Sequence, residues 1–172
     1  MNHIELNTNR LIIRNTKKED ADFCLEIWLD DEMGKYLSDP PRNKANEAYI
    51  KWKENVETYN GCYYFVAVSK GNGDYIGTCS AVPSEDKKHW DLGYAIHKKF
   101  WNQGYATEMI KTLCDFCKEN GAKYITADVA KLNNGSNAVL KKLGFNIEKE
   151  DSFRKSGTDI IYESYTYRLY CY

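Results

Sequence analysis

The sequence predicts an α/β fold in one domain with about seven strands. Seven segments rich in β-branched and aromatic residues alternate with stretches in which apolar residues recur every three or four positions. The chain has 172 residues, enough for one domain that buries about 70% of its unfolded surface. Since no repeat, linker or low-complexity segment interrupts it, we expect a single domain over residues 1–172.

The composition excludes several classes of protein. With 42% hydrophobic and 28% charged residues, the chain is typical of a globular protein. A net charge of −1 argues against a partner that is a nucleic acid or an anionic membrane. No apolar run approaches the roughly 20 residues of a membrane span, and the first seven residues lack the features of a signal peptide. We therefore expect a cytoplasmic location.

The first half of the chain is expected to fold into three strands and two helices. Thr16 and Glu19 fit a capping box that begins the first helix. The second helix has one apolar face, and Asn60-Gly61 ends it. Its apolar positions are Ala45, Ala48, Tyr49, Trp52, Val56 and Tyr59. The strands are Leu11 to Asn15, Tyr63 to Val68 and Tyr75 to Val82, the last two joined as a hairpin by a Gly/Asn-rich turn.

The stretch from Gly93 to Ala106 organises the second half. It leads from a strand, His89 to His97, through a short loop into an amphipathic helix that ends near Gly121. A glycine beside the free N–H groups of a helix N-terminus can form an anion site, although an ordinary strand-to-helix turn has the same pattern. The remaining predicted elements are a strand Tyr124 to Val129, a helix Ser136 to Leu143, a strand Phe145 to Lys149, a polar loop Glu150 to Asp159 and a strand Ile160 to Tyr170.

Cysteine and histidine spacing does not favour a metal site. Cys114 and Cys117 form a C-x-x-C, but it falls inside the predicted long helix and no second pair completes four ligands. We expect reduced thiols, several of them in the core. The histidines have no metal-ligand spacing, and the side chain of His97 is expected on the surface.

Three motifs occur in a characteristic order. They are Arg10-Leu11-Ile12-Ile13-Arg14, the stretch from Gly93 to Ala106, and Asn133 to Phe145 with its Asn-x-x-Ser. Together they resemble the GNAT superfamily of acyl-CoA-dependent N-acetyltransferases, and within it the RimJ/RimL-like branch. The resemblance runs from Arg10 to the C-terminus. It implies a mixed, largely antiparallel sheet with helices on both faces, and acetyl-CoA as co-substrate without a metal.

The resemblance also implies which residues bind the co-substrate. The pyrophosphate is expected on the backbone amides of Asn102, Gln103, Gly104, Tyr105, Ala106 and Thr107. A side chain at Gly104 would block close approach. The family pattern has a second glycine where this chain has Asn102. Because asparagine tolerates left-handed backbone angles, we expect a weaker but workable loop.

Asn133 and Ser136 match two further family positions. Asn133 corresponds to the residue that hydrogen-bonds the pantetheine arm. Ser136 corresponds to a residue near the CoA sulfur, where a hydroxyl could protonate the leaving thiolate. Serine is also a common helix cap, so capping of the short helix is the alternative role for Ser136.

The reaction needs a donor for the thioester oxygen and a neutral amine. The resemblance implies that a backbone N–H near Ile96 and His97 polarises the carbonyl. Asp91, in place of a glutamate common in this branch, is the candidate base. Its side chain is one methylene shorter, which favours a water relay over direct contact. A solvated strand position is the alternative for Asp91.

The pKa of the acceptor amine favours one class of acceptor. A free α-amine has a pKa of about 8, whereas a lysine or polyamine amine near 10.4 starts about 4 kcal/mol further from its neutral form. Since no strong base stands out, a protein N-terminal α-amine is favoured. Candidates to line the acceptor pocket are Trp28, Tyr36, Trp52 and Tyr59, with Asp39, Glu54 or Glu57 to attract a cation. Core packing is the favoured alternative for most of these aromatic residues, because the helical periodicity of the second helix needs no ligand to explain it.

The sequence leaves three other functions open. The protein could acetylate a small molecule such as an antibiotic or polyamine, or bind acyl-CoA as a regulatory ligand without catalysis. It could also be an interaction domain without a CoA site. As no cysteine lies in the loop or the Asn-x-x-Ser segment, direct attack is favoured over an acyl-enzyme, with Cys79 the nearest alternative nucleophile. The tyrosines that crowd the C-terminus suggest core packing or a contact in a homodimer.

Overall fold

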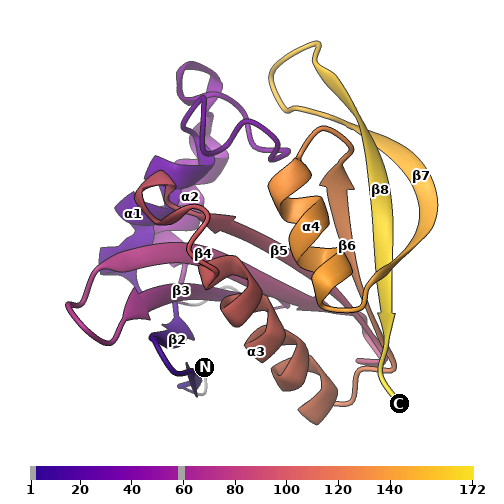
Figure 1. The fold of residues 1–172 in the computed structure, drawn as a ribbon. Coiled ribbons are helices and arrows are strands. Elements are labelled where there is room, and N and C mark those ends of the chain that lie inside the picture. Colours follow the sequence, from indigo (N-terminus) through magenta and orange to yellow (C-terminus); the bar gives the residue numbers. More distant parts are fainter. Residues whose placement is uncertain (1–2, 58–60) are drawn as a thin grey trace.

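A mixed eight-stranded sheet runs through residues 3–57 and 61–172, the part of the chain that the computed structural model describes (Figure 1). The spatial order is β1-β2-β3-β4-β5-β6-β8-β7, and neighbours are antiparallel except for the parallel pair β5 and β6. The strands are β1 Glu5–Asn7, β2 Leu11–Asn15, β3 Tyr63–Ser69, β4 Tyr75–Pro83, β5 His89–Ile96, β6 Tyr124–Ala130, β7 Asn146–Arg154 and β8 Ile161–Tyr170. The mixed, largely antiparallel sheet agrees with the fold class expected from the sequence.

Two parts of the sheet differ from the prediction of about seven strands. β1 was not predicted, because it has only three residues and a single apolar one, Leu6. The predicted loop from Glu150 to Asp159 is wrong in its first half, since β7 continues to Arg154. β7 is highly charged and almost entirely exposed, so its strand conformation depends on pairing with β8 and has no alternating pattern to reveal it.

Helices cover both faces of the sheet. They are α1 Ala21–Trp28, α2 Glu47–Asn55, α3 Tyr105–Glu119 and α4 Asn134–Lys142, and Figure 1 shows α3 and α4 in front of the strands. On the α3 face, the Phe116 ring packs edge-on against Phe65 and Trp90, both with centroids 5.8 Å away. On the opposite face, Trp28 Nε1 of α1 donates to Thr78 Oγ1 at 3.0 Å.

The start of α1 differs from the predicted capping box. Asp20, rather than Glu19, accepts from the Lys17 N–H at 2.7 Å. The Asp20 side chain is buried beside Arg14, which donates to both of its carboxylate oxygens at 2.7 and 2.9 Å. A paired, buried carboxylate makes a stronger acceptor than an exposed glutamate, which explains why the carboxylate half of the box forms one residue later. The other half is missing, because the Lys17 side chain has only donors.

The other helices begin or end close to their predicted positions. α2 is shorter than its apolar pattern suggested, and Tyr59, predicted to lie on it, is outside the described residues. α4 begins at Asn134, two residues before the predicted start. Within residues 3–57 and 61–172, no helix is both long enough and apolar enough to span a bilayer.

The parallel pair β5 and β6 creates a gap in the sheet. Their pairing covers only three positions and ends at Asp91 and Thr126. β5 then runs five residues further, to Ile96, and β6 four further, to Ala130. The backbone edges that face each other beyond this point are therefore not paired with one another, and this gap positions the candidate site.

The C-terminal tyrosines take different roles. Tyr167 is fully buried, whereas Tyr170 and Tyr172 are exposed and stack on each other at 6.0 Å. The core-packing alternative thus applies to Tyr167, and a contact between two copies would have to use the exposed pair.

Candidate active site

The edge of β5 that faces the gap offers backbone groups from Ile96. The His97 N–H donates to Ile76 O at 2.9 Å, so it points toward β4 and is already bonded. Successive N–H groups of a strand point to opposite edges, and the Ile96 N–H is therefore directed into the gap. The Ile96 carbonyl faces the same edge, where Trp101 Nε1 donates to it at 2.7 Å. Of the two amides expected to polarise a carbonyl, only that of Ile96 has the required direction.

Two residues near the end of the loop between β5 and α3 have left-handed backbone conformations. Asn102 has φ 58° and Gly104, the N-cap of α3, has φ 81°. The left-handed backbone is what asparagine and glycine tolerate best. A Cβ on Gly104 would lie 3.5 Å from Arg10 Nη2, an ordinary contact, so backbone conformation and not space within the chain requires the glycine.

The first turn of α3 presents its amides without intrahelical acceptors. The first helical bond runs from the Glu108 N–H to Gly104 O at 3.1 Å. The N–H groups of Tyr105, Ala106 and Thr107 precede it, and such groups with the helix dipole favour an anion.

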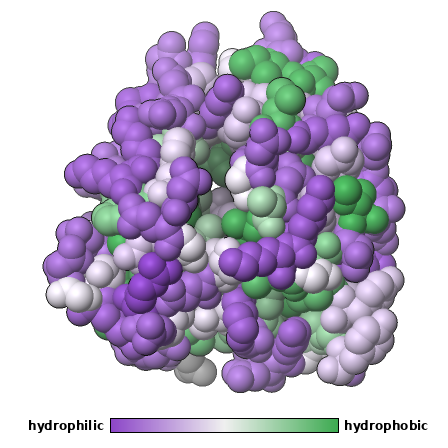
Figure 2. All heavy atoms as spheres, in the orientation of Figure 1, coloured by the Kyte–Doolittle hydropathy of each residue, from purple (hydrophilic) through white to green (hydrophobic). Residues whose placement is uncertain are grey.

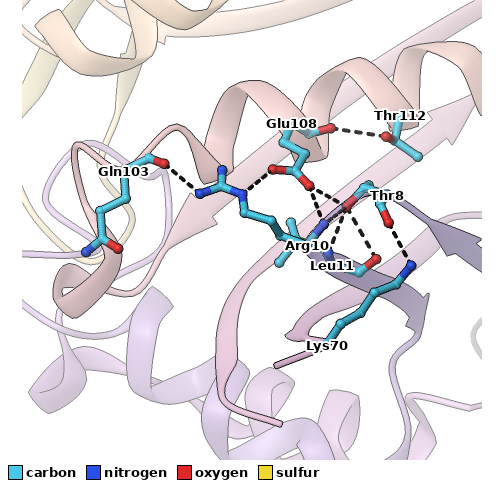
Figure 3. A network of polar contacts seen from close by, with 7 residues as sticks. All are labelled: Thr8, Arg10, Leu11, Lys70, Gln103, Glu108 and Thr112. Carbon is cyan, nitrogen blue, oxygen red and sulfur yellow. Dashed lines mark hydrogen bonds and ion pairs between the residues drawn. The ribbon is translucent and has the colours of Figure 1, made fainter. Parts of the chain in front are cut away.

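An ion pair behind the loop fixes it to the start of the sheet (Figure 3). Arg10 Nε donates to Glu108 Oε2 at 2.7 Å, and its Nη1 donates to Gln103 O at 3.0 Å. The Arg10 guanidinium also lies 4.0 Å from the centre of the Tyr105 ring. Although burial alone would raise the pKa of the Glu108 carboxyl, hydrogen bonds from Thr8 and Arg10 lower it below its usual value. The carboxylate therefore stays charged and keeps the loop in place.

A cavity of about 600 Å³, here called the helix-side cavity, lies in front of this loop. Ser136, predicted to be catalytic, lines it. So do most of the residues predicted to bind the co-substrate: Ile96, Asn102, Gly104, Tyr105, Ala106, Thr107 and Asn133. The face shown in Figure 2 is mostly hydrophilic and is hollowed near its centre, where apolar residues are visible.

Gln103 and His97 do not line the helix-side cavity. The Gln103 side chain donates to Lys99 O at 3.0 Å, and the main-chain carbonyl of Gln103 accepts from Arg10. His97 is not the surface residue we expected, because its ring packs against Phe23 at 6.2 Å and its side chain is only 12% exposed.

The two polar residues of the Asn-x-x-Ser motif have different roles: the asparagine caps helix α4, and the serine hydroxyl lies at the cavity. Asn133 is the N-cap of α4, and its Oδ1 accepts from the Ser136 N–H at 3.2 Å. The Ser136 hydroxyl therefore does not cap the helix. Its Oγ lies 2.6 Å from the Tyr94 hydroxyl, and burial raises the pKa of Tyr94 to about 12. Tyr94, which the sequence analysis did not select, thus holds its proton beside Ser136.

Asn137 is a second residue that sequence reasoning missed. Its buried side chain donates to Ala130 O at 3.0 Å and Asn133 O at 2.8 Å, and accepts from the Tyr167 hydroxyl at 2.6 Å. It joins the end of β6, the start of α4 and β8. An asparagine after an Asn-x-x-Ser motif in a predicted helix interior was the available signal, since asparagine is unfavourable there without such contacts.

A second cavity of about 470 Å³ lies on the other side of β5 and is here called the carboxylate cavity. It contains Asp39, Asp91 and Asp128, and none of the described residues that line it is a lysine or arginine. Tyr94 and Ala95 line both this cavity and the helix-side cavity. The two spaces therefore meet at the gap between β5 and β6.

Asp91 is held in this cavity by Thr126, whose hydroxyl donates to its Oδ1 at 2.6 Å. Burial raises the pKa of Asp91, and the nearby Asp128 carboxylate adds to the increase, while the Thr126 hydrogen bond opposes it. The solvated-strand alternative does not describe this half-buried carboxyl. A carboxyl with a raised pKa is a better proton acceptor than an ordinary one.

A third cavity of about 350 Å³, the aromatic cavity, adjoins the second at Trp28, Asp39 and Tyr64. Trp52 packs against Trp28 with centroids 4.7 Å apart, and Tyr49 donates to Asp39 Oδ1 at 2.8 Å. Trp28 and Trp52 thus lie where the acceptor pocket was expected. Glu57, in contrast, accepts from the Lys18 N–H and lines none of the three cavities in the described part of the chain, as is true of Glu54.

A segment from Asp30 to Pro41 forms part of the wall of all three cavities. Lys155, from the turn between β7 and β8, is only 6% exposed and reaches this segment. Its Nζ donates to Gly34 O at 2.8 Å and Leu37 O at 3.1 Å, and burial lowers its pKa. The β7–β8 hairpin is thereby fastened to the cavity wall.

The thiols offer no activated nucleophile. All six cysteines lie in the described part of the chain and are free, and Cys114 and Cys117 are buried in α3. Cys79 lines the carboxylate cavity, but burial raises the pKa of its thiol well above the usual value. Among residues 3–57 and 61–172, no group of three or more His, Cys, Asp or Glu side chains is arranged to hold a metal ion.

Comparison with known proteins agrees with this geometry. Residues 10–146 match the family described as the acetyltransferase (GNAT) domain. The uncharacterized N-acetyltransferase p20 of Bacillus licheniformis is 27% identical over 147 residues, 83% of each chain. The chain therefore belongs to the GNAT acetyltransferases and is an enzyme that uses acetyl-CoA.

Two solved structures share the fold. The ribosomal-protein-S5-alanine acetyltransferase of Vibrio fischeri superimposes with a TM-score of 0.77 at 20% identity, covering 98% of this chain and 97% of that one. The spermidine N-acetyltransferase of Vibrio cholerae, solved with CoA and spermine, gives 0.81 at 14% identity, covering 95% and 97%. The fold is thus shared with proteins named for both protein and polyamine acceptors.

Proposed function

We propose that this enzyme transfers an acetyl group from acetyl-CoA to a primary amine by direct attack. The observation that carries the proposal is the meeting of the helix-side and carboxylate cavities at Tyr94 and Ala95. One cavity has donors for an anionic, elongated co-substrate, and the other has carboxylates for a cationic acceptor. The thioester and the amine would meet in the gap between β5 and β6.

In this proposal the helix-side cavity receives the CoA portion. The amides of the first turn of α3 face the pyrophosphate, and left-handed Asn102 and Gly104 shape the turn in front of it. Asn133 lies along the path of the pantetheine arm. The Ile96 N–H, directed into the gap, donates to the thioester oxygen as negative charge develops there.

Direct attack requires proton transfers at three side chains. Asp91 accepts a proton from the acceptor ammonium, either directly or through one water. Ser136 Oγ supplies a proton to the leaving sulfur as it receives one from the Tyr94 hydroxyl, 2.6 Å away. Tyr94 then regains its proton from the solvent that enters the helix-side cavity when CoA leaves. The raised pKa of the Cys79 thiol argues against an acyl-enzyme, because the thiolate is the nucleophilic form.

We favour a protein N-terminal α-amine as the acceptor. A carboxyl base matches an ammonium of pKa about 8 better than one near 10.4. A small amine with a second positive charge is the other candidate, supported by the aromatic cavity, where Asp39 lies beside Trp28 and Tyr49. A cytoplasmic location belongs to the proposal, since six free thiols suit a reducing compartment.

Calorimetric titration of the protein with acetyl-CoA, CoA and ATP tests the first half of the proposal. We expect saturable micromolar binding of acetyl-CoA and CoA that is tighter than that of ATP. A panel of N-terminal peptides, diamines and aminoglycosides then tests the acceptor by release of free CoA thiol. Turnover of peptides above that of diamines supports the α-amine, and the reverse order supports the small dication. No binding of acetyl-CoA would overturn the site assignment.

A further inference from the structure

Three side chains of β5 and β6 form a hydrogen-bonded chain at the back of the carboxylate cavity. Asp91 Oδ1 lies 2.6 Å from Thr126 Oγ1, and Thr126 Oγ1 lies 2.7 Å from His89 Nε2. Asp91 and Thr126 occupy paired positions on the two parallel strands. Since His89 precedes Asp91 by two residues, both side chains lie on the same face of β5.

Counting protons fixes the direction of these hydrogen bonds. An ionised carboxylate only accepts, and a threonine hydroxyl has one proton to donate. The Thr126 proton is therefore directed to Asp91. In its other contact, with His89, Thr126 Oγ1 must then accept a hydrogen bond. His89 Nε2 must then carry a proton, whether the ring is neutral or an imidazolium. An Nδ1–H tautomer would compete with Asp91 for the Thr126 proton.

Neighbouring side chains hold the His89 ring in the required orientation. The ring stacks on Tyr124 of β6, with centroids 4.8 Å apart and planes 13° from parallel. The Arg168 guanidinium of β8 also contacts Tyr124, 4.3 Å from its ring centre. The hydrogen-bonded chain is therefore built from two strands in register, with a third strand supporting Tyr124, and it does not depend on a loop.

We propose that Thr126 and His89 are positioning residues for the base of the acetyl transfer: the Thr126 hydroxyl, oriented by His89 Nε2–H, holds Asp91 Oδ1 and leaves Oδ2 for the acceptor amine. This inference rests on the proposed function, because it concerns the same carboxylate. Thr126 also keeps Asp91 ionised in a place where burial and Asp128 favour the neutral acid.

The expected pH dependence follows from the groups that surround Asp91. His89 faces it on β5, Asp128 on β6, Cys62 ahead of β3 and Asp39 across the cavity, while Arg168 lies beyond Thr126 on β8. Loss of the Thr126 hydroxyl removes a hydrogen bond that stabilises the charged form of Asp91. Burial and the Asp128 carboxylate, which favour the neutral form, remain. The Asp91 pKa then rises, and the acid limb of kcat/KM moves to higher pH.

The test compares Thr126→Val, which loses the hydroxyl at nearly constant volume, with Thr126→Ser, which retains it. The Asp91 carboxyl is followed by ¹³C NMR in protein with labelled aspartate and no acetyl-CoA, assigned through Asp91→Asn. We expect Thr126→Val to raise the titration midpoint by about one pH unit and to lower kcat/KM about tenfold on the acid limb. Thr126→Ser should restore both.

Two further measurements separate positioning from a general structural effect. Thr166→Val removes the matching hydroxyl that donates to Asp128 Oδ1 at 2.5 Å, and should move the Asp91 midpoint far less than Thr126→Val does, because Asp128 acts on Asp91 only through its charge. Long-range ¹H–¹⁵N spectra should show neutral His89 as the Nε2–H tautomer. A midpoint unaffected by Thr126→Val, or an Nδ1–H tautomer, overturns the inference. Absence of acetyl transfer by the unmodified enzyme overturns the proposed function instead, because the NMR titration needs no turnover.

Discussion

The cavities on the two sides of β5 are built from different parts of the chain. The helix-side cavity uses the backbone of one continuous stretch, residues 96–107, with its left-handed Asn102 and Gly104. The carboxylate cavity uses side chains from strands and segments far apart, such as Asp39, Asp91 and Asp128. A backbone site tolerates change in most side chains but not in conformation, whereas a side-chain site depends on individual groups. Substitutions should therefore act differently on the two sides.

The largest effect is expected from Asp91→Asn on the carboxylate side. Removing the base should lower kcat/KM about 100-fold with little change in acetyl-CoA affinity, because the loss falls on proton transfer. Steady-state kinetics with the best amine measure this. Asp128→Asn is the matched control, since its carboxylate lines the same cavity but its Oδ1 is bonded to Thr166. It should raise KM and leave kcat within about threefold. Equal losses of kcat in both variants would contradict the assignment of the base.

On the helix side, Gly104→Val should weaken acetyl-CoA binding about tenfold. A β-branched residue resists φ 81° by roughly 1–2 kcal/mol, so the turn would relax and its amides would move. Calorimetric titration gives the affinity. Gly73→Val imposes the same strain at φ 77° in the β3–β4 turn, away from both cavities. Normal affinity in Gly104→Val, or an equal loss in Gly73→Val, would show that the loop is not the anion site.

Ser136→Ala is expected to have a smaller effect, about a fivefold loss of kcat, with melting temperature unchanged. The helix cap belongs to Asn133, whose Oδ1 accepts from the Ser136 N–H, and the backbone amide survives the substitution. Asn133→Ala should instead destabilise the protein by about 1 kcal/mol. Kinetics and thermal denaturation of the two variants separate the roles. Unchanged turnover in Ser136→Ala would remove the serine from the mechanism.

The smallest effect concerns the ion pair behind the loop. Glu108→Gln should lower the free energy of unfolding at pH 7 by about 0.5–1 kcal/mol, since neutral hydrogen bonds partly replace charged ones. The folded pKa of Glu108 is depressed, so its contribution is present above the unfolded pKa of about 4.3 and is lost as pH falls through the folded value. Urea denaturation should show a difference at pH 7 that shrinks below about pH 4. A difference that grows in acid would contradict the role of the carboxylate.

The contrast between the cavities also explains what the sequence could reveal. The glycine turn at Gly104 is visible in the sequence because such turns are determined locally. Asn102 and Asn133 were selected through the family resemblance, and capping of the short helix was considered for Ser136, whereas the structure assigns it to Asn133. Tyr94, Thr126 and Asn137 were missed, since their partners Ser136, Asp91 and Tyr167 become neighbours only through strand register or helix packing. Asp91 was found through the family resemblance, but its raised pKa depends on Asp128 and on burial.

The same distinction holds for the fold. Strands with alternating or continuous apolar residues, β2 to β6, were predicted nearly to their ends. The charged β7 was predicted only as Phe145 to Lys149, and the three-residue β1 was not predicted, because each exists through pairing with a neighbour and contributes little to the core.

Lys155 joins two segments that lie 121 positions apart, and it does so through main-chain oxygens alone. Every residue has a carbonyl, so the side chain of Leu37 and those of its neighbours can be exchanged without losing this attachment, provided that the chain keeps its course. Gly34 is the exception, because a Cβ there would clash with the main-chain oxygens of Trp28 and Asp30. The wall of the acceptor site can therefore diversify in sequence while its distance from the β7–β8 hairpin stays constant. Acceptor choice could change over evolution by substitution in the wall alone, with the position of the wall inherited from a single buried cation.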